Sequence, residues 1–176
     1  MIVAAAGLGL GGALFDDGGG LWLVRRRPRV DSVAGMPSIR PIVLAVLRRG
    51  EAILVFDAHD DVKGETFHRP LGGGIEFGER AEDALKREFR EELDAEIVVN
   101  RLLGVLENVF DWRGNPGHEI AFVYEAEFAD PGLYGEDAMK ILDDPATARW
   151  VELAEFRDGR RILYPEGLIG LLSADQ

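Results

Sequence analysis

The chain has 176 residues, 47% of them hydrophobic and 30% charged, which fits one globular domain, or one domain with an extension, and excludes general disorder. Its formal net charge of −12 argues against binding to long nucleic acids, which requires a basic surface, but a bound cation would still allow a phosphorylated ligand. Because there is no cysteine, disulfides, thiolate catalysis and cysteine-zinc sites are excluded, and we expect a cytoplasmic protein.

Residues 1–35 differ in composition from the rest, and we predict that they form an N-terminal extension to a domain at 36–176. The opening apolar run is shorter than a membrane span, and the first basic residue, Arg25, comes too late for a secretory signal. Residues 13–24 align without a gap on residues 45–56, and both resemble β-hairpins. The linker between them contains Met36, where a shorter natural product would begin.

From Arg40 onward, strands and helices alternate, which predicts an α/β domain with a mixed sheet. Apolar and alternating runs predict strands at residues 42–47, 52–57, 96–110, 119–128 and 148–156, the last running into a turn. Residues 79–93 contain no glycine or proline and predict a helix, and proline begins a short closing helix at 165–175. Between these elements we expect a turn at 111–118 and a long acidic loop at 129–147 with a helical turn.

The predicted helix brings three carboxylates together beside an apolar stripe. Leu85, Phe89 and Leu93 recur at four-residue steps, and Glu88, Glu91 and Glu92 share an adjacent face. Crowded carboxylates repel one another unless a cation is present, and Mg²⁺ binds through one or two carboxylates together with substrate phosphates. These glutamates therefore predict half of a metal site, although a solvated charged face is the alternative for this segment alone.

The spacing of this segment resembles the Nudix box. Gly73 is followed after five residues by Glu79, after seven more by Arg87-Glu88, and after two more by Glu91-Glu92. At ordinary residue frequencies a chance match has a probability of about 10⁻⁷ per starting position. The resemblance covers residues 73–95. Asp94 replaces the glycine usual at the end of the box, where a left-handed conformation is expected.

The resemblance implies a Nudix-type α/β/α sandwich with a mixed β-sheet and a loop-helix-loop metal site. It implies hydrolysis of a diphosphate linkage in a nucleoside diphosphate joined to another group, with Mg²⁺, or Mn²⁺ in its place, as cofactor. Its metal ligands would be Glu88, Glu91, Glu92 and the carbonyl of Gly72, while Glu79 and Arg87 would form a structural ion pair. Glu88 and Glu91 are also candidates for the catalytic base.

Further candidates lie outside the box. Glu119 is a third candidate base, or a further metal ligand, because it follows a glycine turn at the start of a strand. Arg69 and His118 are candidates for substrate binding, and Phe110 and Trp112 for stacking on a nucleobase. The alternative for each is an ordinary surface or core role.

Two other functions are alternatives to this hydrolase activity. The Nudix-fold isomerases that act on isopentenyl diphosphate use a catalytic cysteine, which this chain lacks. A non-catalytic nucleotide-binding regulatory module is the second alternative, although all the box glutamates are present. We expect a small nucleotide-type substrate: a nucleoside triphosphate, ADP-ribose, a nucleotide sugar or a dinucleoside polyphosphate. We expect no membrane association, and a homodimer is compatible with the predicted N-terminal hairpin.

Overall fold

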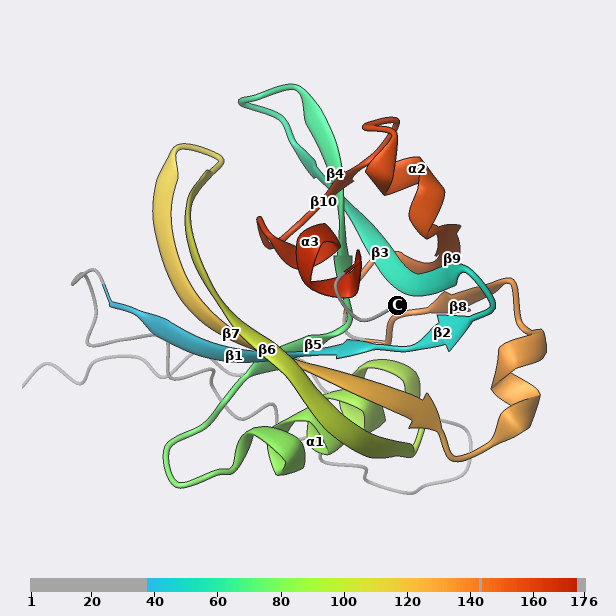
Figure 1. Cartoon of the computed structure of the whole chain (residues 1–176). Helices are drawn as coiled ribbons and strands as arrows, with labels where there is room; N and C mark the ends of the chain where they lie inside the picture. Colours follow the sequence, from blue (N-terminus) through green and yellow to red (C-terminus); the bar gives the residue numbers. More distant parts are fainter. Residues whose placement is uncertain (1–37, 143, 174–176) are drawn as a thin grey trace, which may run out of the picture. The chain divides into compact units, whose positions relative to one another are not determined.

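The computed structural model describes residues 38–142 and 144–173, and all of them belong to the second of two units, Gly35–Gln176, into which the chain divides (Figure 1). The hairpin predicted at residues 13–24 and the linker after it lie outside the described residues. None of the helices in the described part combines the length and apolar composition that a membrane span requires.

The strands of the described residues form two sheets. The first has the order β5-β1-β7-β6 and is mixed, because β1 and β7 run parallel and the other neighbours antiparallel. The second has the order β10-β4-β3-β9-β8, with β2 also paired to β3. The bounds of the strands are β1 Arg40–Val46, β2 Arg48–Arg49, β3 Ala52–Asp60, β4 Glu65–Pro70, β5 Gly72–Gly74, β6 Ile97–Trp112, β7 Asn115–Phe128, β8 Ala138–Lys140, β9 Thr147–Glu152 and β10 Ile162–Leu163.

Helices pack on both sides of β1, which is buried on both faces. Val43, Ala45 and Leu47 face a cluster that includes Leu85 and Phe89 of helix α1 (Ala81–Leu93). The alternate residue Val46 faces a cluster formed with α2 (Leu153–Arg157) and α3 (Leu168–Ser173). Successive side chains of a strand point to opposite faces, so the continuous apolar run of β1 supplies both cores. The predicted α/β fold with mixed sheets is confirmed.

Several element boundaries differ from the predictions. Helix α1 begins at Ala81 rather than Glu79, because Glu79 closes a turn in which its N–H donates to the carbonyl of Glu76. The turn predicted at 111–118 is much shorter, since β6 and β7 pair up to Trp112 and Asn115. The strand predicted at 148–156 ends at Glu152 and continues as α2. The acidic loop contains the predicted helical turn as the 3₁₀ helix η1 (Pro131–Gly135), but also the short strand β8.

Candidate active site

The glycine strand β5 lies tightly between β1 and helix α1. A Cβ atom at Gly72, where φ is +135°, would lie 2.1 Å from the carbonyl oxygen of Val43 on β1. A Cβ atom at Gly73 would lie 2.3 Å from the side-chain carboxyl carbon of Glu88 on α1. Gly72 is therefore required by space, because a side chain there would meet the backbone of β1, whereas Gly73 leaves room for the buried carboxylate of Glu88.

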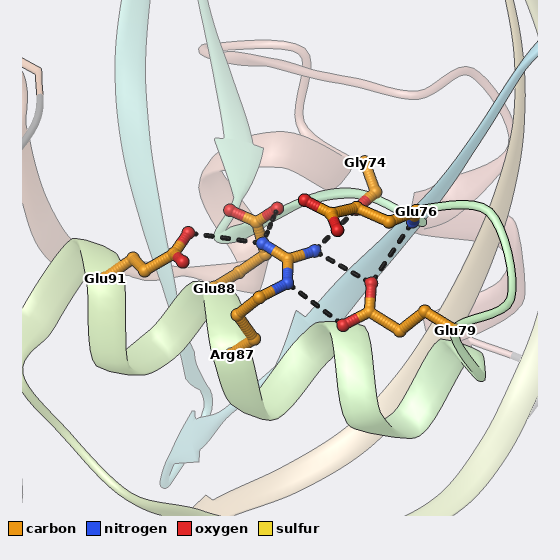
Figure 2. Close-up of polar contacts among 6 residues, drawn as sticks. All are labelled: Gly74, Glu76, Glu79, Arg87, Glu88 and Glu91. Carbon is orange, nitrogen blue, oxygen red and sulfur yellow. Dashed lines mark hydrogen bonds and ion pairs between the residues drawn. The ribbon is translucent and has the colours of Figure 1, made fainter. Parts of the chain in front are cut away.

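Arg87 connects the loop to the helix (Figure 2). Its Nε and Nη2 donate to the two carboxylate oxygens of Glu79, each at 3.0 Å, and Nη2 also donates to the carbonyl of Gly74 at 2.9 Å. On its other side, Nη1 donates to Glu88 at 2.9 Å and to Glu91 at 3.2 Å. The structure thus places the expected pair Glu79 and Arg87 in bidentate contact, and it adds two box glutamates to the same guanidinium.

Arg87 and Glu79 each stabilise the charged form of the other. The hydrogen bonds from Arg87 hold the pKa of Glu79 below its ordinary value, and the bond to Glu79 raises the pKa of Arg87. Glu91 and Glu92 lie in the last turn of α1, where the helix dipole disfavours negative charge. Cationic compensation is therefore needed at this end of the helix, and Arg87 supplies part of it.

The three box glutamates do not form a ready-made metal site. Among residues 38–142 and 144–173, no three acidic or histidine side chains are grouped closely enough to hold a metal ion. The carboxylates of Glu88 and Glu91 are both hydrogen-bonded to Arg87, and their side-chain exposures differ, at 9% and 57%. The donor set still fits a hard divalent cation, because it offers carboxylate oxygens from one helix beside a glycine-lined cradle.

The end of α1 is fixed by backbone contacts. Asp94 has the left-handed conformation expected for its position, with φ 51°, and its N–H donates to the carbonyl of Arg90. The N–H of Ala95 donates to Phe89, and that of Leu142 donates to the carbonyl of Glu92 at 2.8 Å. The acidic loop between β7 and β9 is therefore bonded to the helix at one of the proposed metal ligands.

A second set of charged side chains comes from neighbouring strands. Glu119 of β7 is only 4% exposed, and its carboxylate lies 3.7 Å from Arg69 of β4 and 3.9 Å from Arg40 of β1. Burial lowers the pKa of Arg69, while the charges of Glu119 and Glu92 raise it. Arg69 therefore lies in the field of both Glu119 and Glu92, and it joins the second sheet to the first.

The neighbouring residue His118 does not lie with Glu119, Arg69 and Arg40. It pairs with Val109 on the opposite face of β7 from Glu119, and its Nε2 lies 2.9 Å from Glu107. Asn108, which the sequence analysis missed, is 8% exposed and lies opposite Glu119 in the ladder. The two-residue period of a strand is the signal that could have identified it, because it puts Asn108 on the same face as the apolar residues Leu106 and Phe110.

The predicted aromatic surfaces are largely engaged within the protein. Trp112 packs edge-on against Phe67 of β4, with ring centroids 5.2 Å apart. Phe110 covers Gly117, where a Cβ atom would lie 2.4 Å from its ring. Both aromatics occur at alternate positions of β6, on the same face as Asn108. They line the side of the first sheet that carries Glu119.

Comparisons with known proteins agree with this architecture. The family model of the NUDIX domain matches residues 36–166. The chain is similar to the solution structure of the E. coli ORF135 protein, with 22% identity over 79% of this chain and 89% of that one and a TM-score of 0.51. It is similar to a MutT protein from Methanosarcina mazei (17%, 78% and 93%, TM-score 0.56) and to an ADP-ribose pyrophosphatase from Streptococcus suis (14%, 78% and 92%, TM-score 0.50). At these identities the structures show a shared fold.

Proposed function

The chain belongs to the Nudix family and is a Nudix pyrophosphohydrolase, and from this premise we propose that Glu88, Glu91 and Glu92 hold a divalent cation on which diphosphate hydrolysis depends. The family acts on small nucleotide-type substrates. Mg²⁺ is the proposed ion, with Mn²⁺ as a substitute, and the carbonyl of Gly72 is a proposed fourth ligand. The observation that carries the proposal is the fit of the Glu88 carboxylate against Gly73, beside two further glutamates of the same helix.

Each side chain has a distinct proposed role. When bound, the cation supplies charge neutralisation for the diphosphate and lowers the pKa of a water. Arg87 and Glu79 hold the loop and helix at a fixed separation, which keeps the carboxylates oriented. Glu88 and Glu91 are candidates to accept the proton of the attacking water.

The contacts of Glu119 and Arg69 support roles for both at the same site. Glu119 is a buried carboxylate, and the geometry offers it as a further base or cation ligand. The side chain of Arg69 is 25% exposed, and its guanidinium can hold a substrate phosphate in bidentate fashion. His118 stays a weaker candidate for substrate binding, since it lies on the other face of β7 and is paired with Glu107.

A release assay tests the proposal. Nucleoside triphosphates, ADP-ribose, a nucleotide sugar and a dinucleoside polyphosphate are incubated with wild-type protein in Mg²⁺ and in EDTA. The same panel is run with Glu92→Gln and with the control Glu82→Gln, which changes an exposed glutamate at the other end of α1. We expect turnover that requires Mg²⁺ and falls at least about 100-fold in Glu92→Gln only.

The panel also separates the alternatives for the substrate. ADP-ribose is included because the similar Streptococcus suis protein is an ADP-ribose pyrophosphatase. Nucleoside triphosphates are included because the net charge of −12 favours a small nucleotide over a long nucleic acid. Turnover that persists in EDTA would contradict the proposed cation dependence. Binding of a nucleotide without turnover of any substrate would favour a non-catalytic regulatory module.

A further inference from the structure

Two hairpin ends from different sheets are joined through one buried carboxylate. Asp60 ends strand β3, and its Oδ1 accepts hydrogen bonds from the N–H groups of Val62 and Lys63 in its own turn, at 2.9 and 3.1 Å. Its Oδ2 accepts a bond from the N–H of Arg113, at 3.0 Å, in the turn between β6 and β7. The β3–β4 and β6–β7 hairpins (Figure 1) therefore meet at their ends.

Asp60 is suited to this connection by its burial and charge. It is 1% exposed, although it lies in a turn whose next residue, Asp61, has a side chain 74% exposed. The hydrogen bond from Arg113 is the largest influence that lowers its pKa, so the carboxylate stays ionised and accepts all three bonds. Asp60 therefore stabilises its own turn and also connects that turn to the turn between β6 and β7.

The opposite turn is also unusual. Arg113 has φ 52°, a conformation that arginine rarely adopts, and Gly114 follows with φ 77°. The side chain of Arg113 donates to the carbonyl of His59 at 3.1 Å and lies 3.5 Å from Asp61. In the reverse direction, Lys63 Nζ donates to the carbonyl of Asp111 at 2.7 Å. The left-handed arginine therefore both presents its N–H to Asp60 and holds the other hairpin with its side chain.

Further along the strands from the contact between Asp60 and Arg113, two more contacts join the same pair of hairpins. Phe67 of β4 packs edge-on against Trp112 of β6, and Arg69 of β4 lies 3.7 Å from Glu119 of β7. Phe67 and Arg69 are two residues apart on one face of β4, so the three contacts follow one another along the strands. If the hairpin ends move apart, Arg69 and Glu119 are therefore expected to move apart as well.

We propose that Asp60 is a positioning residue. Its hydrogen bond from Arg113, together with the contacts that the Arg113 and Lys63 side chains make with the opposite hairpin, forms what we call the clasp. The clasp joins the two hairpins and so holds Arg69 and Glu119 in place for substrate. The inference rests on the proposed function, in which Arg69 binds phosphate. The box glutamates lie on α1, which is not part of the clasp, and Glu119 enters this inference as the partner of Arg69 rather than as a base. Loss of the clasp is therefore expected to weaken substrate binding more than the chemical step. Asp60 thus acts on substrate affinity without touching the substrate.

Three variants separate the bonds of the clasp. Asp60→Asn keeps an oxygen for Val62 and Lys63 but presents an NH₂ group to the N–H of Arg113, so it breaks the connection between the hairpins alone. Arg113→Gly keeps the N–H donor and removes the side-chain contacts. The control Asp111→Asn changes a carboxylate whose Oδ1 accepts, among residues 38–142 and 144–173, from Gly114 of its own turn at 2.8 Å.

Hydrogen exchange and kinetics then give independent readouts. In Asp60→Asn we expect the Arg113 amide to exchange at least about tenfold faster, while those of Val62 and Lys63 are little changed. We expect KM to rise about fivefold with kcat within about twofold, the pattern of lost uniform binding. Arg113→Gly should show a smaller rise in KM, and Asp111→Asn should behave as wild type.

The outcomes distinguish this inference from the proposed function. An unchanged Arg113 amide in Asp60→Asn would overturn the clasp itself, and this measurement needs no activity. Faster exchange with unchanged KM would leave a clasp without a positioning role and overturn the inference. If the wild type hydrolysed no substrate, the proposed function would fail, and nucleotide affinity measured by calorimetry would replace KM as the readout of positioning.

Discussion

Gly73 is the residue on which the position of the Glu88 carboxylate depends most directly. A methyl group there would lie 2.3 Å from that carboxyl group, so Gly73→Ala forces the Glu88 side chain to move. We expect turnover to fall about 100-fold, the scale of an ångström-sized misplacement at a reacting site. Steady-state kinetics and circular dichroism would be measured together, and the fold should be kept because the displaced atoms end a flexible side chain.

Gly74→Ala is the matched control for this prediction. No atom lies within 4 Å of a Cβ atom placed at Gly74, and the carbonyl that accepts from Arg87 is unchanged. Its activity should remain within about twofold of wild type. If both variants lost activity equally, the flexibility of the glycine run, rather than the room for Glu88, would be the determining property.

His68 predicts a pH dependence of stability. It is 3% exposed, and burial is the main cause that lowers its pKa. Its Nδ1 lies 3.3 Å from the carbonyl of Ile162, and its Nε2 accepts from Arg161 at 3.0 Å, so the neutral ring is the form that fits. The charged groups around it are Arg161, Asp57, Arg149 and Glu155.

The sign of the effect follows from this lowered pKa. As pH falls below about 6.5, His68 takes up a proton in the unfolded chain but not in the folded protein, so stability decreases until the folded pKa is reached. We expect the Tm of the wild type to fall more steeply than that of His68→Gln between pH 7 and pH 5. Parallel thermal melts across this range would show it, and equal slopes would contradict it.

The C-terminal end of helix α1 carries backbone strain that a substitution can remove. Asp94 ends the helix with φ 51°, where glycine has no steric cost and aspartate does. Asp94→Gly should therefore stabilise the protein by about 0.5–1 kcal/mol, which raises Tm by about 1–4 °C for a chain of this length. Asp94→Ala should do the opposite. Differential scanning calorimetry checks both, and a lower Tm in Asp94→Gly would refute the strain.

Some features of these elements could be predicted from the sequence, and others could not. The position of α1, its apolar stripe and its left-handed end follow from neighbours in the chain, and each could be predicted locally. The turn predicted at 111–118 was too long, because a polar glycine-rich segment resembles a loop until its strands are paired, and the pairing leaves only Arg113 and Gly114 in the turn. The two-residue period of a strand places His118 on the opposite face of β7 from Glu119, so the separation of these two candidates follows from the sequence once the strand is assigned.

Contacts between distant segments depend on the whole molecule and could not be predicted. Asp60 and Arg113 are 53 residues apart, and Arg69 and Glu119 come from different sheets. Their meeting depends on how the sheets pack, which residue spacing alone does not determine. The family resemblance predicted the fold class and the ligand set, whereas the sharing of Arg87 between Glu79, Glu88 and Glu91 required the structure.

The most direct test of the central claim is the affinity for Mn²⁺, measured by electron paramagnetic resonance on the wild type, Glu88→Gln, Glu92→Gln and the control Glu82→Gln. If the carboxylates at the end of α1 hold the cation, the first two variants should bind Mn²⁺ at least about tenfold more weakly, and Glu82→Gln should match the wild type. Wild-type affinity in both Glu88→Gln and Glu92→Gln would contradict the account, because the glutamates would then be crowded for another reason.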